Sequence, residues 1–79
     1  MNIRLLLFGA VADSIGFRKA DIVMPEGATA AELIEKLKEQ YPQLAVHKLL
    51  IAVNEEYAEA TTRLEDGCEA AVFTPVSGG

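Results

Sequence analysis

Hydrophobic residues along the chain fall into short runs that predict strands, interrupted by one longer stretch in a helical pattern. Residues 2–8 are strongly apolar, which is typical of a buried strand. Similar runs predict strands over residues 17–24, 48–53 and 69–74, and residues 57–61 predict a short strand or an irregular edge. The pattern therefore indicates a sheet of about five short strands.

The clearest helical period lies between Thr29 and Pro42. Thr29 is a good N-cap, and Glu32, three residues later, completes a capping box. Apolar residues then recur at helical spacing, with charged residues on the opposite side. The apolar positions are Ala30, Leu33, Ile34, Leu37 and Tyr41. Pro42 ends this main helix, and residues 10–15 predict a short second helix that stops at Gly16.

These elements predict an α+β fold in which one main helix covers one face of a small mixed sheet of about five strands. Seventy-nine residues are enough for one domain, 1–79. Residues 75–79, which begin with Pro75, cannot continue regular structure, so we expect them to leave the domain as a tail.

The face of the sheet away from the main helix is predicted to carry an apolar patch. Side chains alternate between the two faces of a strand, so one set from the first and last strands faces the helix. These residues are Leu5, Leu7, Ala70 and Val72. The outward set is then Leu6, Phe8, Ala71 and Phe73. Such a patch usually marks a site for a protein partner, although residues 10–16 or 55–63 could equally cover part of it.

Charge and composition exclude several classes of function. The net charge of −5 repels polyanions, which argues against a nucleic-acid partner. The longest apolar runs are far too short to span a bilayer, which argues against a membrane role. No signal peptide is visible and only one cysteine is present, and both observations favour a cytoplasmic location.

Single residues that could carry chemistry each have a simpler interpretation. His47 is a lone histidine without other ligands at metal-binding spacing, so we expect no metal site. Cys68 is expected to be a small residue at the start of a strand rather than a reactive thiol. Ser14 and Ser77 have no histidine nearby in sequence, which argues against a triad. We therefore expect no cofactor bound by this chain and no enzymatic activity of the chain alone.

The chain ends in Gly78 and Gly79. Glycine has no side chain, so these last peptide units could pass through a narrow channel in another protein. The reacting group would then be the α-carboxylate of Gly79. A carboxylate is a poor electrophile, but conversion to an acyl-adenylate supplies a leaving group, and a sulfur nucleophile can then leave a thiocarboxylate.

Four segments of the chain resemble a known family. They are residues 5–16 (LLLFGAVADSIG), 49–54, 64–73 (LEDGCEAAVF) and 73–79 (FTPVSGG). In these segments the chain resembles the MoaD-type sulfur carriers, the small subunits of molybdopterin synthase, which have a ubiquitin-like β-grasp fold. Two features depart from the family: Ala12 and Asp13 replace a common Arg-Glu pair, and Cys68 replaces a common acidic residue.

The resemblance implies a cycle of activation and sulfur transfer. A ubiquitin-activating-like adenylating enzyme would use ATP to activate Gly79, and a sulfurtransferase would supply the sulfur. The large subunit of molybdopterin synthase would then accept the tail, and cyclic pyranopterin monophosphate would receive the sulfur in a heterotetrameric complex. The inserted tail residues would be Pro75, Val76, Ser77 and Gly78. The docking surface would be Leu6, Phe8, Ala71 and Phe73.

Other functions fit the same fold and glycine pair. One is a ThiS-type sulfur carrier for thiazole synthesis. Another is a ubiquitin-like protein modifier that joins Gly79 to a lysine. A third is a β-grasp interaction module whose terminal glycines have no role. The FTPVSGG tail and the longer chain favour the molybdopterin pathway.

Overall fold

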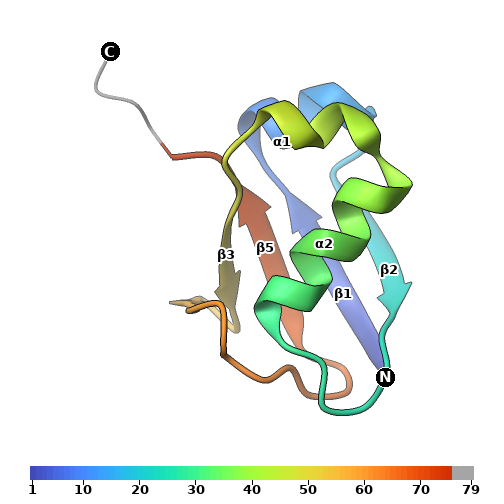
Figure 1. Ribbon diagram of the computed structural model, residues 1–79, viewed down its shortest axis with the longest axis vertical. Helices are drawn as coiled ribbons and strands as arrows, with labels where there is room; N and C mark the ends of the chain where they lie inside the picture. The colour runs from blue at the N-terminus through green and yellow to red at the C-terminus, as the bar shows by residue number, and fades with distance from the viewer. Residues whose placement is uncertain (76–79) are drawn as a thin grey trace.

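The computed structural model describes residues 1–75, which form a five-stranded sheet with helices packed on one face (Figure 1). The elements are β1 (Asn2–Leu7), α1 (Gly9–Ile15), β2 (Lys19–Val23), α2 (Ala30–Gln40), the 3-10 helix η1 (Pro42–Val46), β3 (Leu50–Val53), β4 (Glu56–Tyr57) and β5 (Glu69–Phe73). None of the helices in these residues is long and apolar enough to cross a membrane.

The first and last strands lie side by side at the centre of the sheet. The strand order is β2-β1-β5-β3-β4, and β1 pairs with β5 in parallel while all other pairs are antiparallel. A parallel pair needs a crossover connection, and α2 lies within the chain that links the two strands (Figure 1). The mixed sheet predicted from the strand pattern is therefore confirmed.

The hydrophobic core lies between this sheet and α2. Leu33 and Leu37 of α2 are fully buried, and the inward residues of the central strands meet them. Those strand residues are Ile3, Leu5, Leu7, Ala70 and Val72. Every buried side chain among residues 1–75 is hydrophobic. The predicted division of the two central strands into inward and outward sets is thus confirmed.

Local signals fix both ends of α2. The Thr29 hydroxyl accepts a hydrogen bond from Glu32 N at 3.4 Å, and Glu32 Oε1 accepts one from Thr29 N at 3.2 Å. This is the predicted capping box, which satisfies backbone donors that a helix start leaves unpaired. The helix ends before Pro42, and Tyr41 is its C-cap. Gly16 ends α1 in the left-handed conformation, with φ of 87°.

Several boundaries differ from those predicted. The chain after α2 forms η1, which delays the start of the third strand from residue 48 to Leu50. The weak strand predicted over residues 57–61 is reduced to Glu56–Tyr57, and β5 ends at Phe73 rather than residue 74. Asn54 and Glu55 both have positive φ values, which matches the predicted turn before β4.

Replacing Thr29 with alanine removes the side-chain half of the capping box, and we expect it to lower the free energy of unfolding by about 1 kcal/mol. For a domain of this size, the melting temperature should fall by roughly 4–8 °C. Thermal unfolding followed by circular dichroism would measure the change. Thr61→Ala is the matched control, because Thr61 is exposed outside the helices and strands. Equal effects of the two substitutions would contradict the role assigned to the cap.

Candidate functional site

An apolar patch covers one end of the sheet face that points away from α2. Directly opposite residues of paired strands share a face, so the register assigns the members of this patch. Leu6 lies opposite Ala71, Ala71 lies opposite Ala52, and Phe73 lies opposite Leu50. With Phe8 and Tyr57 added, the apolar patch consists of Leu6, Phe8, Leu50, Ala52, Tyr57, Ala71 and Phe73.

Phe8 is placed in the patch by the end of β1. Its backbone N–H donates to Val72 O at 3.1 Å, so the chain stays beside β5 for one residue past the strand. Phe8 is also the N-cap of α1, and Gly9 turns the chain into that helix with φ of 55°. A side chain is strained at positive φ, so glycine suits this bend. Half of the Phe8 surface remains exposed, at 50%.

Phe73 lies at the root of the predicted tail. Together with Phe8, Gly9, Thr74 and Pro75 it lines an open hollow of about 360 Å³. Pro75 is the last residue that the structure describes, and it leaves the sheet at this hollow. The apolar patch and the exit of the C-terminal segment therefore share one end of the molecule.

Tyr57 extends the apolar patch beyond the residues found from the sequence. Its ring meets the Phe73 ring edge to face, with 5.8 Å between centroids, while 82% of Tyr57 stays exposed. Two segments were expected as possible covers of the patch, residues 10–16 and residues 55–63. Of these, residues 55–63 contact it through the Tyr57 ring. Residues 10–16 instead bury Val11 and Ala12 in the core. Phe8 and Tyr57 are exposed, and the other patch residues are partly buried.

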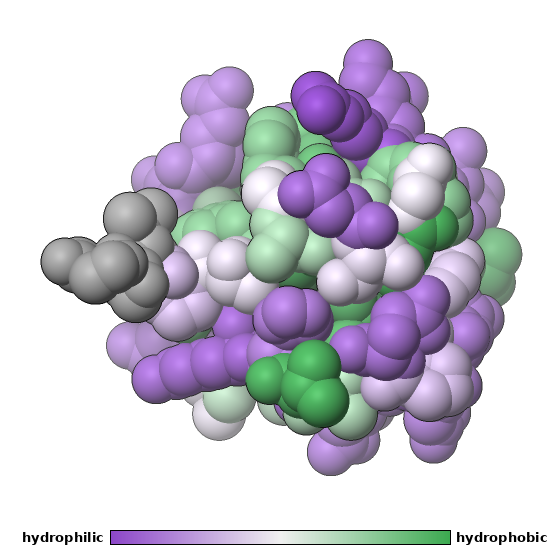
Figure 2. Space-filling model, turned by 90° about the horizontal axis from the view of Figure 1, so that it is seen from above, coloured by the Kyte–Doolittle hydropathy of each residue, from purple (hydrophilic) through white to green (hydrophobic). Residues whose placement is uncertain are grey.

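The surface around this site is mixed rather than uniformly polar. A view from above, onto the end where α1 lies, shows hydrophobic residues between hydrophilic ones (Figure 2). Farther from Pro75, the outer face carries Arg4 of β1, Asp21 of β2 and Glu69 of β5, whereas Lys19 of β2 lies beside the patch, opposite Leu6. The outer face is therefore apolar near Pro75 and charged far from it.

Sequence reasoning identified Leu6, Phe8, Ala71, Phe73 and Pro75, and the structure brings these residues together. It missed Tyr57, Leu50 and Ala52. The alternation of Ala52 with the buried Ile51 could have placed Leu50 and Ala52 outward, but only once the pairing of β3 with β5 was known. The remaining predicted tail residues, Val76, Ser77, Gly78 and Gly79, lie outside the described residues.

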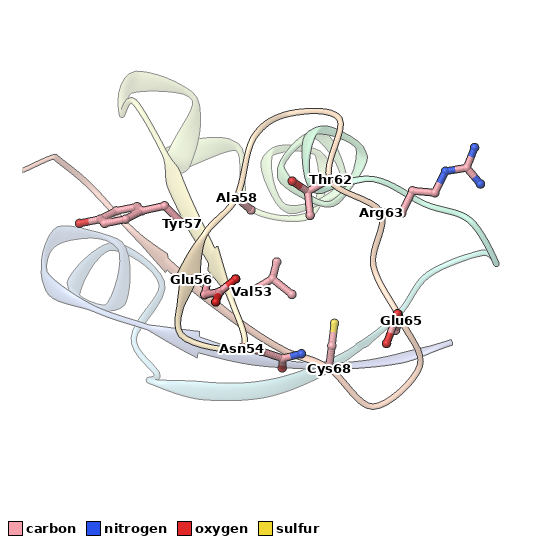
Figure 3. A pocket seen from close by; sticks show the side chains of 9 residues that line it. All are labelled: Val53, Asn54, Glu56, Tyr57, Ala58, Thr62, Arg63, Glu65 and Cys68. Carbon is pink, nitrogen blue, oxygen red and sulfur yellow. The ribbon is translucent and has the colours of Figure 1, made fainter.

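A second cavity, of about 460 Å³, opens at the opposite end of β5 (Figure 3). Cys68 and Val53 point into it, whereas the Arg63 and Tyr57 side chains extend away from its centre (Figure 3). Cys68 is 5% exposed and precedes β5, while Pro75 follows it. Cys68 is thus a buried residue directly before β5, which fits the predicted packing role, and it lies at the opposite end of that strand from Pro75.

Ser14 and His47 are brought together by the fold, which their sequence separation had argued against. The Ser14 hydroxyl lies 3.2 Å from His47 Nε2, and Gln43 Nε2 donates to Ser14 O at 3.3 Å. These contacts join α1 to η1 and the residue that follows it. Among residues 1–75 no group of His, Cys, Asp and Glu side chains is arranged to hold a metal ion.

Comparisons with known proteins agree with this geometry. A model of the ThiS family matches residues 5–79. The chain belongs to the ThiS family. The molybdopterin synthase sulfur carrier subunit of Caenorhabditis elegans is 35% identical over 83 residues, which cover 100% of this chain and 99% of that protein. The predicted family resemblance is therefore confirmed.

Solved structures that are similar to this chain share its fold. A molybdopterin converting factor subunit 1 of Pyrococcus furiosus, described as putative, has a TM-score of 0.89 and 27% identity, covering 96% of this chain and 99% of that one. SAMP1 of Haloferax volcanii has a TM-score of 0.85 and 26% identity, with 100% of both chains covered. Together they confirm the ubiquitin-like β-grasp fold.

A complex of subunits 1 and 2 of the molybdopterin-converting factor from Helicobacter pylori contains another chain of this fold. The TM-score is 0.68 and the identity 24%, with 100% of both chains covered. At this identity the likeness concerns the fold alone. It shows that a protein of this architecture has been solved bound to a second subunit.

Replacing Tyr57 with alanine should lower the free energy of unfolding by about 0.5–1.5 kcal/mol, because the edge-to-face contact with Phe73 is lost. Tyr57→Phe is the matched control: it keeps the ring and should leave stability unchanged. Urea unfolding followed by circular dichroism would measure both. A Tyr57→Ala protein as stable as the Tyr57→Phe protein would contradict the contact.

Proposed function

We propose that this ThiS-family chain is the sulfur carrier subunit of a molybdopterin synthase. The observation that supports it best is the partly exposed apolar patch at the point where the chain leads into FTPVSGG. A partner that binds the patch receives the C-terminal residues at the same place. The relatives named as molybdopterin synthase sulfur carriers, which match the whole chain, favour this pathway over thiazole synthesis.

The proposed chemistry takes place at the α-carboxylate of Gly79. A ubiquitin-activating-like adenylating enzyme joins this carboxylate to the AMP portion of ATP and releases pyrophosphate. A sulfur nucleophile supplied by a sulfurtransferase then attacks the acyl carbon, AMP leaves, and a thiocarboxylate results. In the synthase, the thiocarboxylate sulfur forms a bond to cyclic pyranopterin monophosphate, and water then cleaves the bond between that sulfur and the acyl carbon. The sulfur stays on the precursor and the terminal carboxylate is restored for another cycle.

The domain itself positions its C-terminal residues for the partner enzymes and does not carry out the chemistry. It places Phe8 and Phe73 beside Pro75, so docking fixes the starting point of the tail. The reacting carbon lies four residues beyond Pro75, close enough for the docked domain to hold it within the partner. We infer that the large synthase subunit and the adenylating enzyme provide the residues that stabilise charge during each transfer.

A second function has support from one comparison. SAMP1 of Haloferax volcanii, whose name stands for small archaeal modifier protein, matches the entire chain. A modifier would use the same activation of Gly79 but would transfer the acyl group to a lysine amine. The two functions differ in the product found at Gly79: a thiocarboxylate or an amide.

Deleting Gly79 should abolish sulfur transfer and leave the fold intact, because residues 75–79 follow the last strand and Pro75 is exposed. Molybdopterin formation from the precursor, with purified partners, would measure the loss. Mass spectrometry of the unaltered protein from its own cell should show the mass increase of one oxygen replaced by sulfur. Lysine conjugates without any thiocarboxylate would support the modifier instead, and an active deletion protein would refute the mechanism.

Replacing Phe8 with aspartate should weaken binding to the large subunit by about 30-fold, since a central aromatic contact is worth roughly 2 kcal/mol and the new charge would be buried unpaired. Calorimetric titration would measure the affinity. Val46→Asp is the matched control, because Val46 is an apolar residue with 85% exposure outside the apolar patch. If both variants bind like the original protein, docking does not use the patch.

A further inference from the structure

The strand β2 forms an edge of the sheet, and its hydrogen bonds show which of its residues face outward. Arg18 O accepts from Leu7 N at 2.8 Å, and Met24 N donates to Met1 O at 2.9 Å. Backbone groups in an antiparallel pair point toward the partner at every second residue. The even-numbered residues of this segment therefore bond to β1, and the odd-numbered ones direct their backbone groups away from the sheet.

The outward residues are Lys19, Asp21 and Val23. Lys36 Nζ donates to Val23 O at 2.7 Å, which confirms that this carbonyl points away from β1. Within residues 1–75, β2 is the last strand on its side, so the backbone groups of Lys19 and Asp21 meet no further strand (Figure 1). An open edge of this kind can pair with another strand.

Charges alternate in sign along a row that leads to this edge. On the outer face, Glu69 lies opposite Arg4, and Arg4 lies opposite Asp21. The row thus runs negative, positive, negative, and it ends at β2. A strand that added to this edge would continue the alternation if it placed a cation opposite Asp21. Lys19, two residues from Asp21, is exposed on the same face of β2.

We propose that β2 pairs in an antiparallel manner with β2 of a second copy of this chain, around a two-fold axis at Ala20. This register sets Lys19 of each copy opposite Asp21 of the other, which is the self-complementary arrangement that a two-fold interface requires. The outward backbone groups of these two residues then bond to one another across the interface. Each charge row gains one more residue, Lys19 of the other copy, and then ends, because Lys19 lies opposite the apolar Leu6; no like charges are placed opposite each other.

Other two-fold registers fit less well. An axis at Asp21 places two aspartates opposite each other, and an axis at Lys19 does the same with two lysines. An axis at Ile22 sets Asp21 opposite the apolar Val23 and brings Pro25, which has no N–H, opposite Lys19. The Ala20 register is therefore the one in which both charges and backbone bonds are matched.

The proposed dimer leaves most of the apolar patch free, with only Leu6, which lies opposite Lys19, bordering the interface. A two-fold axis perpendicular to the sheet puts the outer faces of both copies on the same side, and β2 is separated from β5 by β1. A single short strand buries much less than about 1,000 Å², so the association should be weak. Charged residues on an edge can also prevent pairing, and a protein that stays monomeric would show that they do so here.

Sedimentation velocity and amide NMR on the full chain, from micromolar to about 1 mM, would test the proposal, since weak dimers form in this range. We expect dimers at the upper concentrations, with the Lys19 and Asp21 amides showing the largest concentration-dependent shifts. Asp21→Lys or Lys19→Asp alone should weaken association at least about tenfold, because like charges then face each other. The double variant Lys19→Asp with Asp21→Lys should restore it.

Glu39→Lys is the matched control, since it changes the net charge as Asp21→Lys does at an exposed position in the last turn of α2. It should leave the dimer unchanged. A monomer at every concentration would overturn the proposal. Equal weakening of association by Glu39→Lys, or failure of the double variant to restore association, would also overturn it. A dimer that Phe8→Asp disrupts instead would place the contact on the apolar patch and would overturn the proposal as well.

Discussion

The parallel pairing of β1 with β5 is the constraint on which the other features of this domain depend. It joins two segments separated by most of the chain, with Leu7 opposite Val72. The α2 crossover must then lie on one face, where it covers the inward side chains of both strands. The same register continues for one residue beyond β1, where Phe8 N bonds to Val72 O. The position of the core, the order of the strands and the proximity of Phe8 to Phe73 therefore all follow from this one pairing.

Much of this arrangement could be predicted from local patterns. The capping box at Thr29 and the helical period after it defined α2, and strand alternation separated inward from outward residues. Contacts between distant segments could not be predicted in this way. The Tyr57 contact with Phe73 depends on how β4 joins the sheet, and the approach of Ser14 to His47 depends on where η1 lies against α1. Neither has a signal within its own stretch of sequence.

The outer face of the sheet divides into two regions with different physical character. Near Pro75 its residues are apolar and aromatic, which suits a partner that excludes water around the C-terminal segment. At the other end, charged residues of β1, β2 and β5 alternate in sign. In the two proposed contacts, apolar burial at the first end would supply affinity, while charge alternation at the second would set register and orientation more than strength. One sheet can therefore take part in two contacts that do not compete.

The placement of β5 between β1 and β3 also has a mechanical consequence. A partner that holds the domain and pulls on the residues after Pro75 applies a force along the axis of β5. The hydrogen bonds on both sides of that strand lie across the direction of the force, so they are loaded together in shear rather than opened one after another. Tension on the tail is thus spread over the centre of the sheet, and the domain can bear a load at its chain end without losing the strand that carries it.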